Sequence, residues 1–244
     1  NGTGSTDGTP NGKGNIVIGY NEIDDDSFRT GSHNLVVGMA NSYSGHGGIV
    51  AGFNNIQTGE LASVLGGEGN TASGSNAVVV AGESNRASAH NSVVVAGSTN
   101  EVDSQGSVIV TGLNNYVDGV FTGIVGGNSN DAAGAYSSIL GGASNLTSGE
   151  SSVIAGGQAG VASGRSSAIL SGLGGQASGS TSAIVSGHIN IASAANSAIL
   201  GGYKNEAIAE QSSVGGGYWN TAATIGSWTA GAYSESTELY DVAY

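Results

Sequence analysis

The sequence contains no cysteine, a single proline (Pro10) and few charged residues, which make up 9% of its 244 residues. The absence of cysteine excludes a disulfide-bonded scaffold and a metal site built from thiolates. No run of about 18 apolar residues is present, so the sequence predicts no membrane-spanning helix. Lysine and arginine number 5 against 18 acidic residues, a formal net charge of −13. The lack of a basic patch argues against nucleic acid and anionic membranes as partners.

Glycine is abundant, with 45 residues, and it recurs at a fixed period. No Gly-X-Y pattern is present, which excludes a collagen-like chain, and the many valines and isoleucines favour an all-β fold. From Gly52 to Gly217 a glycine stands at every fifteenth residue, and we call this glycine position 0. Gly38 precedes Gly52 by 14 residues, and Gly19 precedes Gly38 by 19 because of an insertion at 22–27. The repeat predicts a single repetitive domain over 15–226.

Each repeat carries the same pattern of large, small and polar residues. Asparagine occupies +3 and alanine or valine occupies +5 in ten of the twelve regular repeats, whereas +4 varies freely. We expect +3 and +5 to face inward and +4 to face water, because successive side chains of a strand alternate between its faces. Position −3 is always aliphatic and is the expected core: Ile16, Leu35, Ile49, Val64, Val79, Val94, Ile109, Ile124, Ile139, Ile154, Ile169, Ile184, Ile199 and Val214.

These columns predict an all-β fold, a parallel β-solenoid (β-roll) of 15-residue coils with two short strands in each coil. We expect the asparagine column to form ladders between coils, with its backbone in the left-handed conformation that asparagine tolerates at turns. A polar ligand-binding stripe is the weaker alternative for this column.

Position −2 is also aliphatic in most repeats, although it adjoins −3 and must point to the opposite face of its strand. A monomer rarely exposes so long an apolar stripe, so we predict that it is a subunit interface. Three rolls can bury all three stripes around a shared axis, which favours a trimer, and a two-chain sandwich is the alternative. The predicted interface residues are Leu65, Val80, Val95, Val110, Val125, Leu140, Leu170, Val185 and Leu200.

Three segments resemble a known repeat. Ala194–Gly201, with the sequence AANSAILG, is similar to the Asn-Ser-x-Ala-Ile-x-Gly repeat of the YadA-like head domains of trimeric autotransporter adhesins, and Asn91–Gly97 and Ser151–Gly156 are alike. The resemblance covers about 15–226. It implies a left-handed parallel β-roll, a homotrimer, and a role in attachment at the bacterial cell surface or in the extracellular space.

The sequence departs from that family in its period, which is 15 rather than the usual 14, and in its asparagine column. A secreted subunit of a self-assembling filament, such as a bacterial surface fibre or a phage fibre, is therefore the alternative function. Attachment to a host or matrix surface and end-to-end association of copies are the partners that the two hypotheses imply.

Candidate catalytic and metal-binding residues do not form a recognisable motif, so we expect no enzyme, no cofactor and no metal site. The acidic triplet Asp24–Asp26 lies in the insertion without EF-hand spacing, which favours a solvated turn. The four histidines show no metal-ligand spacing, and they are His33, His46, His90 and His188.

The two ends of the chain differ from the repeat. We expect 1–14 to be an extended glycine-rich segment. The aromatic segment 227–244 is expected either to cap the solenoid or to dock subunits end to end, because open terminal coils expose strand edges.

Overall fold

The computed structural model describes residues 6, 8–22, 28–232 and 235–236. The chain divides into two compact units, Asn1–Phe121 and Thr122–Tyr244, which we call unit 1 and unit 2. Each unit is a parallel β-solenoid, and the described residues contain no helix. The predicted fold class is therefore confirmed. The acidic triplet Asp24–Asp26 and most of the aromatic C-terminal segment lie outside the described residues.

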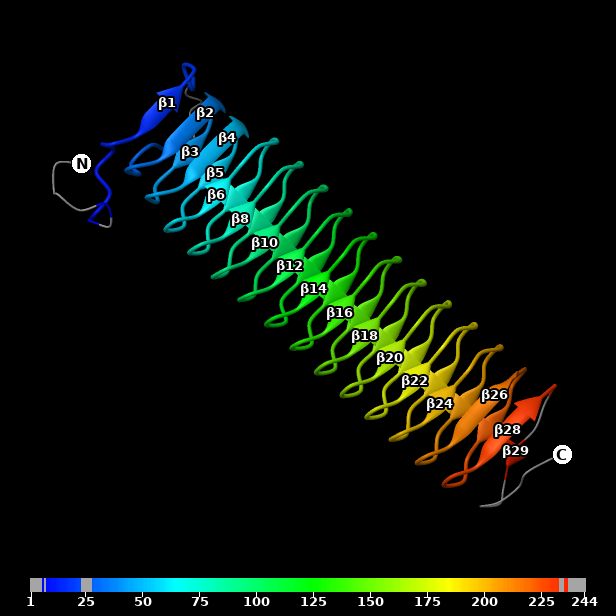
Figure 1. Cartoon of the computed structure of the whole chain (residues 1–244). Helices are drawn as coiled ribbons and strands as arrows, with labels where there is room; N and C mark the ends of the chain where they lie inside the picture. The colour runs from blue at the N-terminus through cyan, green and yellow to red at the C-terminus, as the bar shows by residue number, and fades with distance from the viewer. Residues whose placement is uncertain (1–5, 7, 23–27, 233–234, 237–244) are drawn as a thin grey trace. The chain divides into compact units, whose positions relative to one another are not determined.

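In unit 1, the strands of successive coils pair in parallel in two sheets, stacked rung by rung (Figure 1). The first sheet consists of β1 (Ile16–Ile18), β2 (Leu35–Met39), β4 (Ile49–Phe53), β6 (Ser63–Val64), β8 (Val78–Val79), β10 (Val93–Val94) and β12 (Val108–Ile109). The second sheet consists of β3 (Ser42–Tyr43), β5 (Ile56–Gln57), β7 (Thr71–Ala72), β9 (Arg86–Ala87), β11 (Glu101–Val102) and β13 (Tyr116–Val117).

Unit 2 repeats the arrangement. Its first sheet consists of β14 (Gly123–Ile124), β16 (Ser138–Ile139), β18 (Val153–Ile154), β20 (Ala168–Ile169), β22 (Ala183–Ile184), β24 (Ala198–Ile199), β26 (Ser213–Gly217) and β28 (Trp228–Gly231). Its second sheet consists of β15 (Asp131–Ala132), β17 (Leu146–Thr147), β19 (Val161–Ala162), β21 (Gln176–Ala177), β23 (Ile191–Ala192), β25 (Glu206–Ala207), β27 (Thr221–Ala222) and β29 (Glu235–Ser236). Strands β28 and β29 therefore continue the solenoid beyond residue 226, where the repeat was expected to end.

The core of each unit is a thin layer between its two sheets. Aliphatic side chains at −3, such as Val79 and Ile139, are fully buried, and they face small buried residues at +5, such as Ala87 and Ala132. Large residues on one sheet and small ones on the other bring the sheets close together. The predicted inward orientation of −3 and +5 is confirmed from Val64 onward.

The buried asparagines at +3 join successive coils through side chain to backbone hydrogen bonds. Asn70 Oδ1 accepts a hydrogen bond from the backbone N–H of Asn85 at 2.9 Å. Asn70 Nδ2 donates to the carbonyl of Gly66 in its own coil and to that of Gly82 in the next, at 3.2 and 2.8 Å. The ladder is confirmed, but its predicted left-handed backbone is wrong: positive φ falls one residue earlier, as at Ser84 (φ 55°).

The assignment of core residues in the first coils was wrong by one residue. Leu35 and Ile49 lie half-buried on the outer face, and Val36 and Val50 are the core residues, with no exposed surface. The cause is a change in coil length: Val50 pairs with Val64, only 14 residues later. Coils from Val64 onward have one more residue between the core aliphatic and the glycine, so counting back from the glycine selects the wrong neighbour.

Candidate subunit interface

The nine residues of the predicted interface lie on the outer face of the first sheet in their units. In unit 1, Leu65 and Val110 are exposed and Val80 and Val95 are half-buried. The residues of unit 2 are 37–58% exposed, and they are Val125, Leu140, Leu170, Val185 and Leu200. Their outward orientation agrees with the sequence analysis, and their burial between copies stays a prediction.

Backbone hydrogen bonds hold this column in place although it lies just beyond each short strand. The Leu65 N–H donates to the Val79 carbonyl at 2.9 Å, and the Val80 N–H donates to the Val94 carbonyl at 3.0 Å. Each −2 side chain therefore stands above the −2 side chain of the next coil. The result in each unit is an ordered row of aliphatic groups, spaced by the distance of about 4.8 Å between neighbouring strands.

A second column, at −4, widens the apolar face and was missed by the sequence analysis. It lies two residues before −2 and therefore on the same side of the strand. In unit 1 it contributes Val78, Val93 and Val108, which are half-buried. No charged residue occupies −4 or −2 from Ser63 to Gly215. The signal in the sequence was the alternation of strand faces: if −3 points inward, then both −4 and −2 point outward.

In unit 2, Trp228 closes the far part of this apolar face. It follows Ser213 in the −4 column, because these two residues pair in β28 and β26. A Cβ added to Gly215 would lie 2.9 Å from Cζ2 of Trp228. The indole therefore covers the place that an aliphatic side chain fills in earlier coils, which explains why the −2 residue here is glycine.

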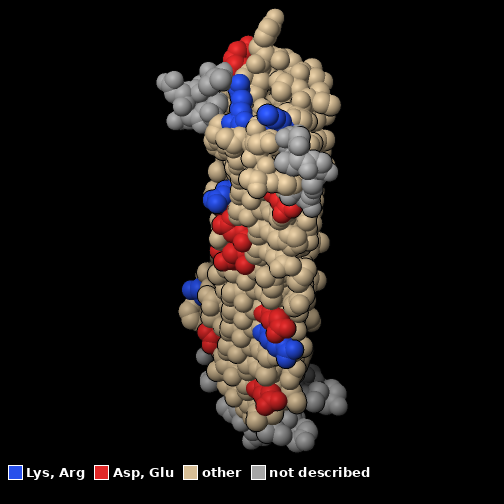
Figure 2. Space-filling model, turned by 90° about the vertical axis from the view of Figure 1, so that its left-hand side faces the viewer, with Lys and Arg blue, Asp and Glu red and all other residues tan. Residues whose placement is uncertain are grey.

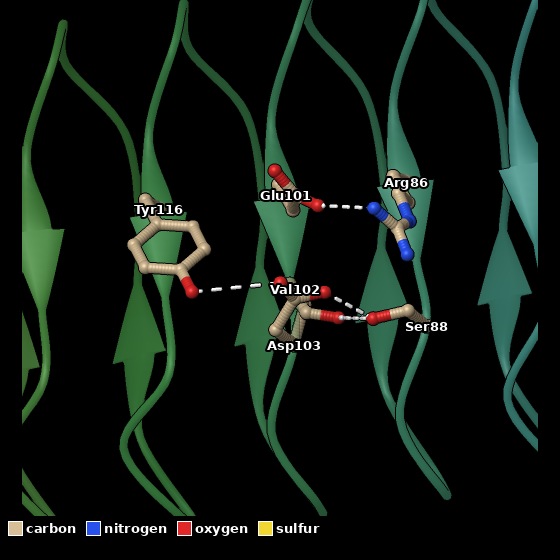
Figure 3. Close-up of polar contacts among 6 residues, drawn as sticks. All are labelled: Arg86, Ser88, Glu101, Val102, Asp103 and Tyr116. Atoms are coloured by element: carbon tan, nitrogen blue, oxygen red, sulfur yellow. Dashed lines mark hydrogen bonds and ion pairs between the residues drawn. The ribbon is translucent and has the colours of Figure 1, made fainter.

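The charged residues of the described chain are sparse, and Figure 2 shows them scattered on one face among a larger uncharged surface. A charged cluster in unit 1 lies on the second sheet, at β9 and β11 (Figure 3). There Arg86 pairs with Glu101 at 2.8 Å, and Asp103 accepts hydrogen bonds from the hydroxyls of Ser88 and Tyr116. Half of the Arg86 side chain is exposed, so the ion pair contributes little to stability.

The environment of Tyr116 disfavours its ionised form. Partial burial raises the pKa of its hydroxyl above 10.0, and the nearby carboxylates of Asp103, Asp118 and Glu101 raise it further. At neutral pH the Tyr116 hydroxyl is therefore protonated and donates its hydrogen bond to Asp103. The cluster therefore has the chemistry of a solvated surface network.

An aromatic group on unit 2 forms a second notable surface that the sequence analysis did not identify. His188, Tyr203 and Tyr218 occupy +1 in three successive coils, with ring centroids 5.1 Å apart. Trp219 adjoins Tyr218, and the Lys204 ammonium lies 4.7 Å from the Trp219 ring. The rings therefore pack against one another, and the Lys204 ammonium forms a cation–π contact within the group. Aromatic residues recurring at one position of the repeat were the signal for this group.

The described residues contain no group of three or more histidine, aspartate or glutamate side chains that could hold a metal ion. Nor does the described part of the chain contain a helix long and apolar enough to cross a membrane. Of the four histidines, His46 approaches Glu60 at 3.4 Å, and His188 belongs to the aromatic group.

Comparison with protein-family models gives no match, and comparison with curated proteins gives none.

Proposed function

We propose that this chain is an extracellular structural and adhesive module, which assembles into a homotrimer through the outer face of its first sheet. The observation that carries the proposal is the apolar, charge-free surface formed by −4 and −2. In unit 1 it includes Val78, Val80, Val93 and Val95 in two successive coils. Contiguous apolar patches of this kind on a soluble chain mark interaction sites.

A second and third copy of this chain are the partners that fit the surface best. The −4 and −2 side chains repeat once per coil. A second copy has the same spacing, so the side chains of each coil can pack against those of a coil in the other copy. Removing this surface from water contributes roughly 25 cal/mol per Å² of apolar area. The charged network of Arg86 and Glu101 lies on the other sheet of unit 1 and stays in water in such an assembly.

Three copies explain the surface more fully than two, because three rolls can turn their apolar faces toward one axis. The resemblance to YadA-like heads supports this geometry, and with it a left-handed roll and attachment at the bacterial surface. The acidic chain, with a net charge of −13, is compatible with an adhesive surface for matrix or cell-wall components and unsuited to nucleic acid.

Light scattering coupled to size-exclusion chromatography tests the assembly. We expect a mass of three times 23.6 kDa, or whole-number multiples of that trimer mass, at micromolar concentration. A stable, folded monomer over the same range contradicts the proposed interface. Attachment is tested separately with beads that carry the assembled chain on glass coated with extracellular-matrix proteins. Adhesion no greater than that of beads carrying an unrelated acidic protein contradicts the adhesive role.

A further inference from the structure

Strand β1 in unit 1 is an apolar edge strand with little cover. Its three residues, Ile16, Val17 and Ile18, are 63%, 46% and 56% exposed. Val17 belongs to the core column, since it pairs with the fully buried Val36. A core residue is thus left half in water because a coil lies on one side of it only. Proteins usually protect such edges with charge, proline or a covering segment, because an open edge pairs with other strands.

Residues 12–13, just before β1, do not cover this edge. The Gly12 N–H donates to the Thr30 carbonyl at 2.9 Å, and the His33 N–H donates to the Lys13 carbonyl at 3.3 Å. Residues 12–13 therefore form hydrogen bonds with the following coil, as β1 does, and not across the open edge of β1. Among the described residues, β1 pairs with β2 alone.

The last strand of the first sheet in unit 2 has a complementary edge. In the regular coils of each unit, residues at −4 and −2 donate their N–H groups to the following coil, as Val78 does to Ser92 and Val80 to Val94. In β28 the corresponding donors are Trp228 and Ala230. At the edge of β1 the corresponding acceptors are the carbonyls of Asn15 and Val17.

Coil length at the two edges also matches. Strands β1 and β2 pair without a bulge, through Ile16–Leu35, Val17–Val36 and Ile18–Val37. At the other edge the extra residue is lost again: Gly217 pairs with Gly231, 14 residues later, and the register shift falls between Val214 and Gly216. Parallel pairing between two copies requires edge strands with the same number of residues between the core residue and the glycine. Strands β1 and β28 meet this requirement, whereas the regular coils have one more residue at this point.

We propose that copies of this chain associate end to end, with β28 of one copy pairing in parallel with β1 of the next. The register continues the existing columns: Trp228 opposite Ile16, Thr229 opposite Val17, Ala230 opposite Ile18 and Gly231 opposite Gly19. This contact joins two different surfaces and does not close on itself, so it generates a filament. It is independent of the lateral assembly proposed above.

Disulfide trapping tests the register directly, because the natural chain contains no cysteine. Two single variants, Ile18→Cys and Ala230→Cys, are mixed under mild oxidation and separated on a non-reducing gel. Paired residues on neighbouring strands lie about 4.8 Å apart, within the range of Cα separations that a disulfide spans. We expect the mixture to give more covalent dimer than either variant gives alone through the lateral assembly, and we expect the double variant to form a ladder of multimers.

The control replaces Met39, an exposed residue of the inner strand β2, with cysteine. Met39→Cys mixed with Ala230→Cys should give no covalent dimer. Absence of the Ile18–Ala230 dimer, or equal trapping of the control, overturns the proposal. Dimers formed by each variant with itself and none in the mixture also overturn it, since parallel lateral neighbours place identical residues together.

A proline variant tests the backbone contact without cross-linking. Val17→Pro removes an N–H group that faces away from β2, so the bonds between β1 and β2 persist. Val17→Ala is the matched control, because it shortens the side chain and keeps the N–H. We expect filaments of the wild type and the alanine variant in negative-stain images, and short particles of the proline variant with unchanged circular dichroism. Filaments of equal length in all three contradict the proposed pairing.

Discussion

The Asn70 side chain binds the backbone N–H of Asn85 in the next coil, and this contact repeats along the column of buried asparagines. Asn85 in turn binds the N–H of Asn100 and donates to the carbonyl of Gly97, at 3.0 and 2.8 Å. Each asparagine thus satisfies backbone groups at the turn where the chain passes from one sheet to the other. The ladder performs at this turn the role that interstrand hydrogen bonds perform within the sheets.

Replacement of Asn85 by alanine is expected to lower the free energy of unfolding by about 1–3 kcal/mol. The variant leaves the buried Asn100 N–H without its acceptor, whereas the Gly97 carbonyl still accepts a hydrogen bond from the Glu83 N–H at 3.0 Å. Asn128→Ala is the control, since Asn128 is exposed, and its effect should stay within about 0.5 kcal/mol. Thermal and denaturant unfolding measure both. Equal stability of the two variants contradicts the structural role of the ladder.

Two adjacent glycines in unit 2 are expected to differ strongly in their tolerance of the same substitution by alanine. Gly142 has φ of +92°, and a Cβ there would lie 2.2 Å from the carbonyl oxygen of Gly157. Gly141 has no atom within 4 Å of the same position. Gly142→Ala should therefore destabilise the fold by several kcal/mol or prevent folding, because backbone atoms cannot move aside. Gly141→Ala should change the unfolding free energy by less than about 1 kcal/mol, and a similar loss in both variants contradicts this account.

Stability should fall at alkaline pH through Tyr116. Its pKa is raised above 10.0 in the folded chain, so the unfolded chain releases the proton first as pH rises. The folded state then holds more protons than the unfolded state, and unfolding becomes more favourable above pH 10. Tyr116→Phe should make this loss smaller. Unfolding free energies at pH 9 to 11 check the prediction, and identical pH profiles of the two proteins contradict it.

The fold was readable from the sequence because every coil repeats the same physical requirements. A fixed glycine, an aliphatic at −3 and a small residue at +5 define a thin two-sheet roll without any long-range information. The interior position in the first coils was not readable in this way. Val50 and Ile49 are both aliphatic, and only the pairing of Val50 with Val64 shows which one faces the core.

The surface was predicted less completely than the core. The −2 column was found because large aliphatic residues stand at a position that is expected to face water. The −4 column holds smaller or half-buried residues, such as Val93, and did not stand out in the same way. The contact between Trp228 and Gly215 joins residues of successive coils where the coil shortens, and a constant repeat length cannot reveal it. The aromatic group around Tyr203 was missed for a related reason, since +1 varies freely elsewhere in the chain.

The apolar face is expected to lose its ability to assemble when charges are placed on it. Val110 lies on the outer face of unit 1 and Val125 on that of unit 2, and both are exposed in the single chain. The double variant Val110→Asp and Val125→Asp puts six carboxylates near the axis of a trimer, and each unpaired buried charge costs several kcal/mol.

We expect this double variant to run as a monomer in light scattering or to fail to fold. Asp at Thr71 and Gln176 is the matched control, because both residues lie on the outer side of the second sheet and the added charges stay in water. The control should assemble as the wild type does, with its unfolding free energy changed by no more than about 0.5 kcal/mol. Circular dichroism separates loss of folding from loss of assembly. A double variant that keeps the wild-type mass and fold shows that the apolar face is not where copies meet, and a control that dissociates equally shows that added negative charge alone is responsible.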